Sequence, residues 1–216
     1  MSYSELKNFD SEIKREKQIQ YICGIDEAGR GPLAGVVSAG CVYIASEDFS
    51  IEELNDSKKL SEKKREKIFD FIDQSSDKLY YGYGTASVEE IDEYNILNAT
   101  YMAMQRAYNN MIDKLRMAGL PLPTLALIDG NLAPKLPIET VTVVKGDAKS
   151  ASIASASIVA KVLRDRYMLT LAEEYPEYMF EKHKGYGTKL HYEKIMEYGI
   201  SPVHRLSFLK KITGEK

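Results

Sequence analysis

The chain has 216 residues, of which 44% are hydrophobic and 28% charged, and its formal net charge is −3. These values are ordinary for one well-filled globular domain. No apolar run approaches the roughly 20 residues that a membrane-spanning helix needs, and the polar start of the chain lacks the apolar core of a secretion signal. The composition therefore argues against a membrane partner and indicates a cytoplasmic protein.

Charge is distributed unevenly along the chain. Residues 1–144 carry 16 lysines and arginines against 23 acidic residues, whereas residues 145–216 carry 13 against 9. A basic C-terminal third can follow a phosphate backbone, although solvated helix faces explain the same charges equally well. Charge by itself therefore leaves a nucleic-acid partner open.

The first predicted elements are a charged leader over residues 1–19, helical or loose, and two strands over residues 20–27 and 35–45. β-Branched and aromatic residues dominate both strands, and glycine and proline separate them, which is typical of an antiparallel hairpin with a wide turn. Cys23 and Cys41 lie within these strands and are the only cysteines of the sequence, so we expect buried thiols rather than a disulfide or zinc ligands.

The order of the remaining elements predicts a mixed sheet. Further strands are expected over 79–86, 125–129 and 141–144, and the order strand, helix, strand favours parallel pairing of the later ones. The other segments are predicted to be helical: a charged helix from Ser61, a short one from Ser87 to about residue 95, and helices over 97–118, 150–174, 189–198 and 206–212. We expect one domain over residues 20–216.

Four carboxylates stand where apolar strands end. Asp26 and Glu27 follow the first strand, Asp129 ends the run 125–128, and Asp147 follows residues 141–146. Burying an unpaired carboxylate costs roughly several kcal/mol unless it is protonated, paired or bound to metal. Mg²⁺ and Mn²⁺ prefer such oxygen ligands, so the pattern predicts a site for two divalent ions. Neighbouring side chains of a strand point to opposite faces, so Glu27 joins Asp26 only if the strand bends or Glu27 reaches around.

Other interpretations of these residues stay open. An aspartate beside a glycine, taken alone, is more often a surface loop residue or a helix cap than a metal ligand. The sequence contains no Gly-Lys-Ser/Thr phosphate loop and no Gly-x-Ser-x-Gly nucleophile elbow. His183, His191 and His204 lack the spacing of zinc ligands and are predicted to be loop or interface histidines.

Several sequence blocks, in a fixed order, resemble one family. They are Gly-Ile-Asp-Glu-Ala-Gly-Arg-Gly-Pro-Leu-Ala-Gly at 24–35, Asn-Asp-Ser-Lys-Lys-Leu at 55–60, Ile-Asp-Gly-Asn at 128–131, Lys-Gly-Asp at 145–147 with the helix that follows, and His-Lys-Gly-Tyr-Gly-Thr at 183–188. In these blocks the chain resembles bacterial ribonuclease HII, a type 2 ribonuclease H. The resemblance implies an α/β fold, a ribonuclease H-like mixed five-stranded sheet flanked by helices, with a C-terminal helical extension.

The resemblance also assigns roles to residues by position. It implies that Asp26, Glu27, Asp129 and Asp147 are the metal-binding catalytic acids. It implies that the loop Gly29, Arg30, Gly31 recognises the 2′-hydroxyl of a ribonucleotide, because glycines let backbone groups approach a sugar closely, and that Tyr186 stacks on the following sugar. Four lysines are candidates for phosphate contacts, although solvated side chains explain them equally well: Lys58, Lys59, Lys149 and Lys184.

The expected activity is that of a metal-dependent endoribonuclease, acting as a monomer with two Mg²⁺ or Mn²⁺ ions when substrate is bound. It would cut the RNA strand of RNA/DNA hybrids and single ribonucleotides embedded in duplex DNA, leaving 5′-phosphate and 3′-hydroxyl ends. One alternative is ribonuclease HIII, which normally carries an N-terminal domain that the roughly 20 residues before the first strand cannot supply. Another is a catalytically silent module that binds hybrids through the basic C-terminal surface.

Overall fold

The computed structural model describes residues 2–51, 54 and 60–213. Over these residues, five strands form one sheet in the order β3-β2-β1-β4-β5. They are β1 (Ile22–Ala28), β2 (Val37–Ile44), β3 (Leu79–Ala86), β4 (Leu125–Asp129) and β5 (Glu139–Val143). β1, β2 and β3 pair antiparallel, whereas β4 pairs in parallel with both β1 and β5. The predicted mixed sheet is therefore confirmed, although a loop rather than a helix joins β4 to β5.

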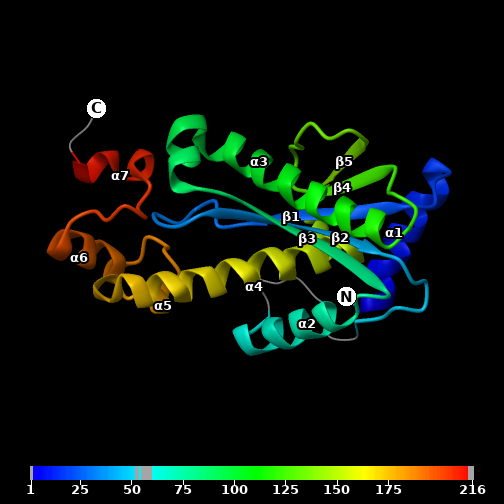
Figure 1. Ribbon diagram of the computed structural model, residues 1–216, viewed down its shortest axis with the longest axis horizontal. Helices are drawn as coiled ribbons and strands as arrows, with labels where there is room; N and C mark the ends of the chain where they lie inside the picture. Colours follow the sequence, from blue (N-terminus) through cyan, green and yellow to red (C-terminus); the bar gives the residue numbers. More distant parts are fainter. Residues whose placement is uncertain (1, 52–53, 55–59, 214–216) are drawn as a thin grey trace.

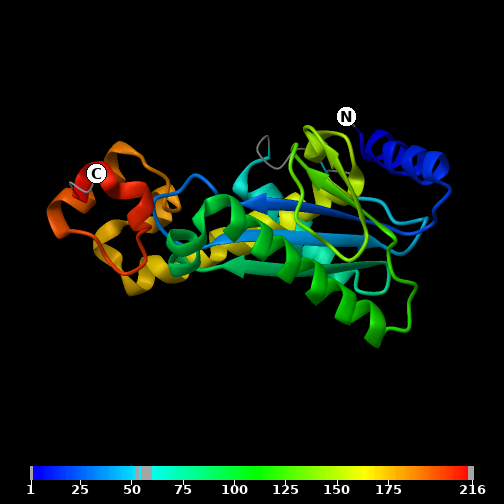
Figure 2. The ribbon, with the colours of Figure 1, turned by 90° about the horizontal axis from the view of Figure 1, so that it is seen from above.

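Helices cover both faces of the sheet, and Figures 1 and 2 show α3 and α4 on opposite sides of it. The α-helices are α1 (Tyr3–Lys17), α2 (Glu62–Gln74), α3 (Val88–Met117), α4 (Ala151–Glu174), α5 (Phe180–His183), α6 (Lys189–Tyr198) and α7 (Leu206–Thr213). Two short 3₁₀ turns are η2 (Gly146–Ala148) and η3 (Pro176–Tyr178). Of the described helices, none is both long and apolar enough to cross a membrane.

The two helices predicted around residue 95 are one helix with a kink. Asn95 has φ 67°, inside α3, and its side chain accepts hydrogen bonds from the N–H groups of Leu97 at 3.0 Å and Asn98 at 3.2 Å. Asn95 thus caps the second half of α3 while the chain continues without a loop.

Glycines let the helices lie close to the sheet. A Cβ atom at Gly24 or Gly40 would lie 2.2 Å or 2.4 Å from backbone atoms of α4, and one at Gly82 or Gly84 would lie 2.0 Å or 2.4 Å from backbone atoms of α3. The small residues in the first half of α4 serve the same close approach. As a result α4 packs directly against β1, the strand that carries the first two acids.

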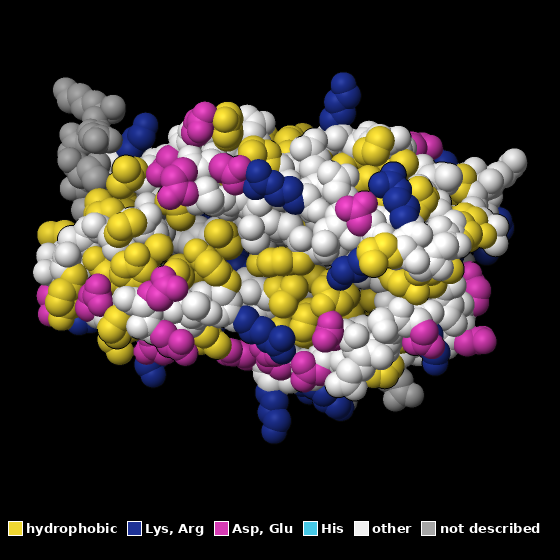
Figure 3. Space-filling view, viewed as in Figure 1, with side chains coloured by type: hydrophobic (Ala, Val, Ile, Leu, Met, Phe, Trp, Pro, Cys, Tyr) yellow, Lys and Arg dark blue, Asp and Glu magenta, His cyan; other side chains and the backbone are white. Residues whose placement is uncertain are grey.

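The edge strand β3 is closed by polar side chains of α3. Three residues spaced by four on α3 bind backbone groups of alternate β3 residues: Lys114 with Tyr81, Asn110 with Tyr83, and Arg106 with Thr85. Figure 3 shows hydrophobic side chains gathered between α3 and α4 over this edge, with lysines and arginines scattered singly on that face. An edge whose backbone groups are already bound is protected from pairing with another chain.

The N-terminal leader is helical. Helix α1 buries Leu6, and its Asp10 accepts a hydrogen bond from the Ser152 N–H at the start of α4, at 2.9 Å. It lies at one end of the molecule, and α5, α6 and α7 form the other end (Figure 2). The domain boundary at residue 20 stays a prediction. Cys23 and Cys41 are buried free thiols, as predicted.

Candidate active site

Three of the predicted acids converge at one edge of the sheet. One carboxylate oxygen from each of Asp26, Asp129 and Asp147 lies within 4.8 Å of the other two. Parallel pairing of Ile25 with Ile128 brings the carboxyl ends of β1 and β4 together, so Asp26 and Asp129, which follow directly, lie side by side. Acids more than 100 positions apart in the sequence therefore share one site.

Asp147 reaches this site from a turn. It lies in η2, between β5 and α4, after Lys145 has taken the left-handed conformation with φ 57°. Gly146, next to it, donates its backbone N–H to Asp129 Oδ1 at 2.6 Å. The turn thus places Asp147 beside the end of β4, where it is 4% exposed.

Glu27 stands apart from the three aspartates. It lines a small cavity together with Thr100 and Leu97 of α3, whereas Asp26 hydrogen-bonds to Ser157 of α4. Glu27 forms an ion pair with Arg30 at 3.3 Å. Alternation along a strand turns neighbouring side chains to opposite faces, yet Glu27 and Asp129 both line this small cavity as well as the larger one that Asp26 lines. Glu27 as a metal ligand therefore stays a prediction.

The site concentrates negative charge in a buried place. Burial raises the pKa of Asp26 well above its usual value, and the nearby carboxylates of Glu27 and Asp129 raise it further. Burial also raises the pKa of Glu27, although Arg30 opposes that rise. A divalent cation relieves such repulsion, and a donor set made of carboxylate oxygens suits Mg²⁺ or Mn²⁺. The residues present therefore fit the expected metal.

A cleft of about 250 Å³ extends from Asp26 and Asp129, and four of the predicted substrate-binding residues line it, namely Gly29, Arg30, Gly31 and Tyr186. Its lining is Asp26, Glu27, Ala28, Gly29, Arg30, Gly31, Arg65, Asp129, Ser157, Lys161 and Tyr186. A Cβ atom at Gly31 would lie 4.0 Å from the ring of Tyr186, so the glycine loop and this tyrosine face each other. Gly29 has φ +90° and a Cβ there would lie 2.0 Å from Arg164 Nε, so packing as well as access to a sugar requires glycine.

Sequence reasoning missed three residues that line the cleft, namely Ser157, Lys161 and Arg65. Lys161 lies 5.7 Å from the Tyr186 ring centroid and pairs with Asp165 at 2.7 Å. Ser157 and Lys161 are four apart on α4, so they share a helix face. This four-residue spacing was the signal in the sequence that could have identified them.

The candidate lysines differ in their surroundings. Lys184 lies 3.7 Å from Glu62 and donates to the Glu181 carbonyl, and Lys149 is exposed just after η2. Lys58 and Lys59 lie outside the described residues. A phosphate contact stays a prediction for all four.

The sequence is similar to a family of known proteins over most of its length. The family model described as Ribonuclease HII matches residues 23–211. The chain belongs to the ribonuclease HII family. Ribonuclease HII from Clostridioides difficile (strain 630) is 54% identical over 197 residues, covering 91% of this chain and 73% of the relative. That from Fusobacterium nucleatum subsp. nucleatum is 52% identical, covering 88% and 86%.

Solved structures support the same fold. The ribonuclease H2 of Pyrococcus horikoshii OT3 has a TM-score of 0.69 at 26% identity, covering 91% of this chain and 97% of that one. The PCNA:RNase HII complex of Archaeoglobus fulgidus gives 0.65 at 26%, covering 87% and 94%. Bst-RNase HIII in complex with Mn²⁺ gives 0.66 at 15%, covering 91% and 70%, which shows the fold alone.

Family membership confirms the resemblance drawn from the motifs and the expected fold. The protein is a ribonuclease H, a phosphodiester hydrolase of a metal-dependent family that acts on RNA/DNA hybrids.

Proposed function

We propose that this ribonuclease HII hydrolyses both the RNA strand of hybrids and single ribonucleotides embedded in duplex DNA, leaving 5′-phosphate and 3′-hydroxyl ends. The observation that carries this proposal is the convergence of Asp26, Asp129 and Asp147, together with a cleft that Asp26 and Asp129 line on one side and the Gly29–Gly31 loop and Tyr186 line on the other. Hydrolysis chemistry and ribose recognition would then meet in one place.

Asp26, Asp129 and Asp147 would hold Mg²⁺ or Mn²⁺, with Glu27 as a further ligand beside Asp129. Two such ions, when bound, lower the pKa of a water molecule and neutralise charge on the leaving 3′ oxygen. The protein's own part is to fix the carboxylates. Ser157 orients Asp26, and the Gly146 N–H orients Asp129. Hydrogen-bonded ligands keep their geometry when substrate arrives.

The glycine loop and Tyr186 supply recognition. The 2′-hydroxyl distinguishes RNA from DNA, and backbone groups of Gly29 to Gly31 are close enough to the cleft to bind it. Tyr186 is 41% exposed, which leaves its ring free to stack on a sugar. Lys161, beside that ring, adds positive charge where a phosphate would pass.

The test is cleavage of a duplex with one ribonucleotide, compared with an all-DNA duplex, in Mg²⁺ and in Mn²⁺. Mutation of residues that only support metal ligands lowers activity by up to about 100-fold. Asp26→Asn, which changes a proposed ligand itself, is therefore expected to lower the cleavage rate at least about that much. Asp10→Asn is the matched control, because Asp10 is equally buried and lies outside the cleft. No cleavage by the wild type, or full activity of Asp26→Asn, contradicts the proposal.

The same assay separates the alternatives. Strong preference for a long hybrid over the single-ribonucleotide duplex is expected of a ribonuclease HIII-like enzyme. Binding of hybrid without metal-dependent turnover is expected of a silent binding module. We also propose that the protein acts as a monomer, which a mass measurement in solution tests.

A further inference from the structure

Arg205 is a buried arginine that supports the glycine loop. It is 0% exposed, and its three guanidinium nitrogens all donate to backbone carbonyls. Nη2 donates to Gly29 at 2.7 Å, Nη1 to Arg30 at 3.1 Å, and Nε to Gly35 at 2.8 Å. Because a guanidinium donates in a fixed planar fork, these bonds fix the loop's position.

His204, the preceding residue, supports Tyr186 through a second histidine. Its Nδ1 accepts the Ser201 N–H at 3.1 Å, so its proton must be on Nε2. That Nε2–H donates to His191 Nε2 at 3.0 Å, so His191 carries its proton on Nδ1 and donates it to the Tyr186 carbonyl at 3.0 Å. A backbone group at each end therefore fixes the tautomer of both rings.

The rings are held neutral by their surroundings. His191 is 0% exposed and His204 1%. Burial lowers the pKa of each to about 4. Phe180 packs against both rings, with centroids 5.6 Å and 5.8 Å away. At neutral pH the chain of hydrogen bonds is therefore complete.

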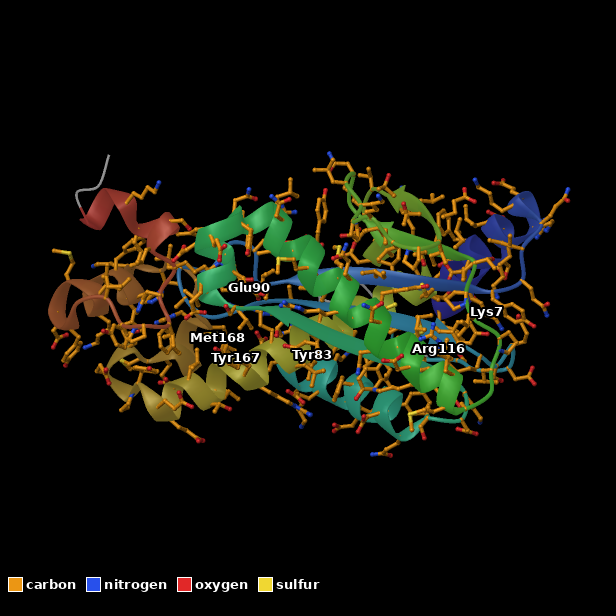
Figure 4. The ribbon with its side chains drawn as sticks, turned by 45° about the horizontal axis from the view of Figure 1, so that its top comes forward. Lys7, Tyr83, Glu90, Arg116, Tyr167 and Met168 are labelled. Carbon is orange, nitrogen blue, oxygen red and sulfur yellow. The ribbon has the colours of Figure 1, made fainter. Side chains whose placement is uncertain are left out.

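The backbone of the same segment joins the two loops. Arg205 N–H donates to the Leu33 carbonyl at 2.8 Å, and Leu33 N–H donates to the Gly185 carbonyl at 2.8 Å. His204 forms an antiparallel bridge with Ala34. Met168 of α4, labelled in Figure 4, supports both loops, because a Cβ at Gly35 or Gly185 would lie 2.5 Å or 3.2 Å from its side chain.

We infer that His204 and Arg205 are positioning residues that fix the spacing between the Gly29–Gly31 loop and Tyr186, and that this spacing sets selectivity for a ribonucleotide followed by DNA. Consecutive residues of an extended segment point in opposite directions, so the pair His204 and Arg205 can support Tyr186 on one side and the glycine loop on the other. The inference rests on the proposed function of the glycine loop and Tyr186 in recognising the ribonucleotide. It assigns His204, His191 and Arg205 no contact with substrate.

The test compares paired variants of the full chain on a single-ribonucleotide duplex and on a long RNA/DNA hybrid. His191→Leu removes the donor to Tyr186, whereas His191→Asn keeps an N–H near the position of Nδ1. Losing a buried hydrogen bond is expected to raise KM for the single-ribonucleotide duplex about 10-fold with His191→Leu, with kcat changed less than about 3-fold. His191→Asn is expected to recover most of the affinity. Cleavage of the long hybrid is expected to change less.

Arg205→Lys and His204→Leu are expected to lower the same selectivity. The inference would be overturned if KM for the single-ribonucleotide duplex did not change. It would also be overturned if KM rose equally with His191→Leu and His191→Asn, or if cleavage of both substrates fell equally. If the wild type itself fails to cut the single-ribonucleotide duplex, the proposed function fails instead.

A second measurement needs no variant to fold. Nitrogen-15 NMR of the wild-type histidine rings is expected to show His204 protonated at Nε2 and His191 protonated at Nδ1. The opposite tautomers, or two rings exchanging freely between tautomers, would contradict the chain of hydrogen bonds.

Discussion

Asp129 Oδ1 accepts the backbone N–H of Gly146 at 2.6 Å, and this bond joins the end of β4 to the turn that carries Asp147. One acid of the proposed metal site thus fixes the backbone that positions another. Gly146 has little spare room, because a Cβ there would lie 2.6 Å from Ile153 Cδ1 and 3.2 Å from Asp129 Oδ1. The geometry of the site depends on this contact.

Gly146→Ala is therefore expected to weaken Mn²⁺ binding about 10- to 100-fold, as for other changes to the surroundings of a metal ligand. Titration calorimetry without nucleic acid measures this directly. Lys149→Ala, three residues along, is the control, since its exposed side chain lies outside the acid group and its loss should leave Mn²⁺ affinity unchanged. Equal affinity of Gly146→Ala and the wild type would show that the turn does not position the acids.

Metal binding is expected to stabilise the fold. A ligand present at about 100 times its Kd adds about 2.7 kcal/mol to the free energy of unfolding. Asp26→Asn should lose most of this gain. In EDTA the same variant should unfold at a higher temperature than the wild type, because it removes a crowded buried carboxylate. Thermal unfolding with EDTA and with Mn²⁺ measures both effects, and an unaltered Mn²⁺ response of Asp26→Asn contradicts the assignment.

The histidine pair predicts a pH dependence of stability. Each ring has a pKa of about 4 in the folded protein against a usual value of 6.5, so the unfolded chain binds more protons between these values. The free energy of unfolding should fall as pH falls from about 6.5 to about 4, by at most roughly 1.4 kcal/mol per pH unit for each histidine.

Comparison with His204→Gln isolates this effect, because one titrating ring is then absent. Asp10, whose pKa burial raises to about 6, contributes in the opposite direction, but it is present in both proteins and cancels in the difference. Chemical denaturation at several pH values gives the two slopes. Parallel curves for the two proteins between pH 4 and 6.5 would count against two buried neutral rings.

The kink of α3 offers a test of the fold. Asn95 both tolerates a positive φ and caps the following turn. Asn95→Gly keeps the backbone conformation and should cost a few tenths of a kcal/mol, whereas Asn95→Ala loses both features and should cost about 1 to 2 kcal/mol. Urea unfolding measures the pair. Equal costs would mean that the kink is not held by Asn95.

The sequence predicted the features that depend on local pattern. Acids at strand ends located Asp26, Asp129 and Asp147. Alternation along a strand separated Glu27 from Asp26, and Glu27 lies outside the group of three converging carboxylates. Helix starts at Ser61 and Ser87 followed from their capping chemistry, and both serines are N-caps in the structure. These signals lie within a few residues of each other.

Features that depend on contacts between distant segments could not be predicted from the sequence. His183, His191 and His204 were predicted as separate loop or interface histidines, yet they form one buried cluster with rings 4.3 Å and 5.2 Å apart. The spacing of these histidines in the sequence does not indicate the cluster, because the fold of α5, α6 and the following segment brings the three rings together. Asp165 likewise pairs with Lys161 on its own helix at 2.7 Å and with Arg65 of α2, 100 positions away in the sequence, at 4.0 Å.

Crystals of the protein soaked in Mn²⁺, with diffraction measured at the manganese absorption edge, test the central claim most directly. We expect an anomalous peak within bonding distance of carboxylate oxygens of Asp26, Asp129 and Asp147, and we expect this peak to be lost in the Asp129→Asn variant. Manganese bound elsewhere, in a protein that cuts the single-ribonucleotide duplex, would contradict it.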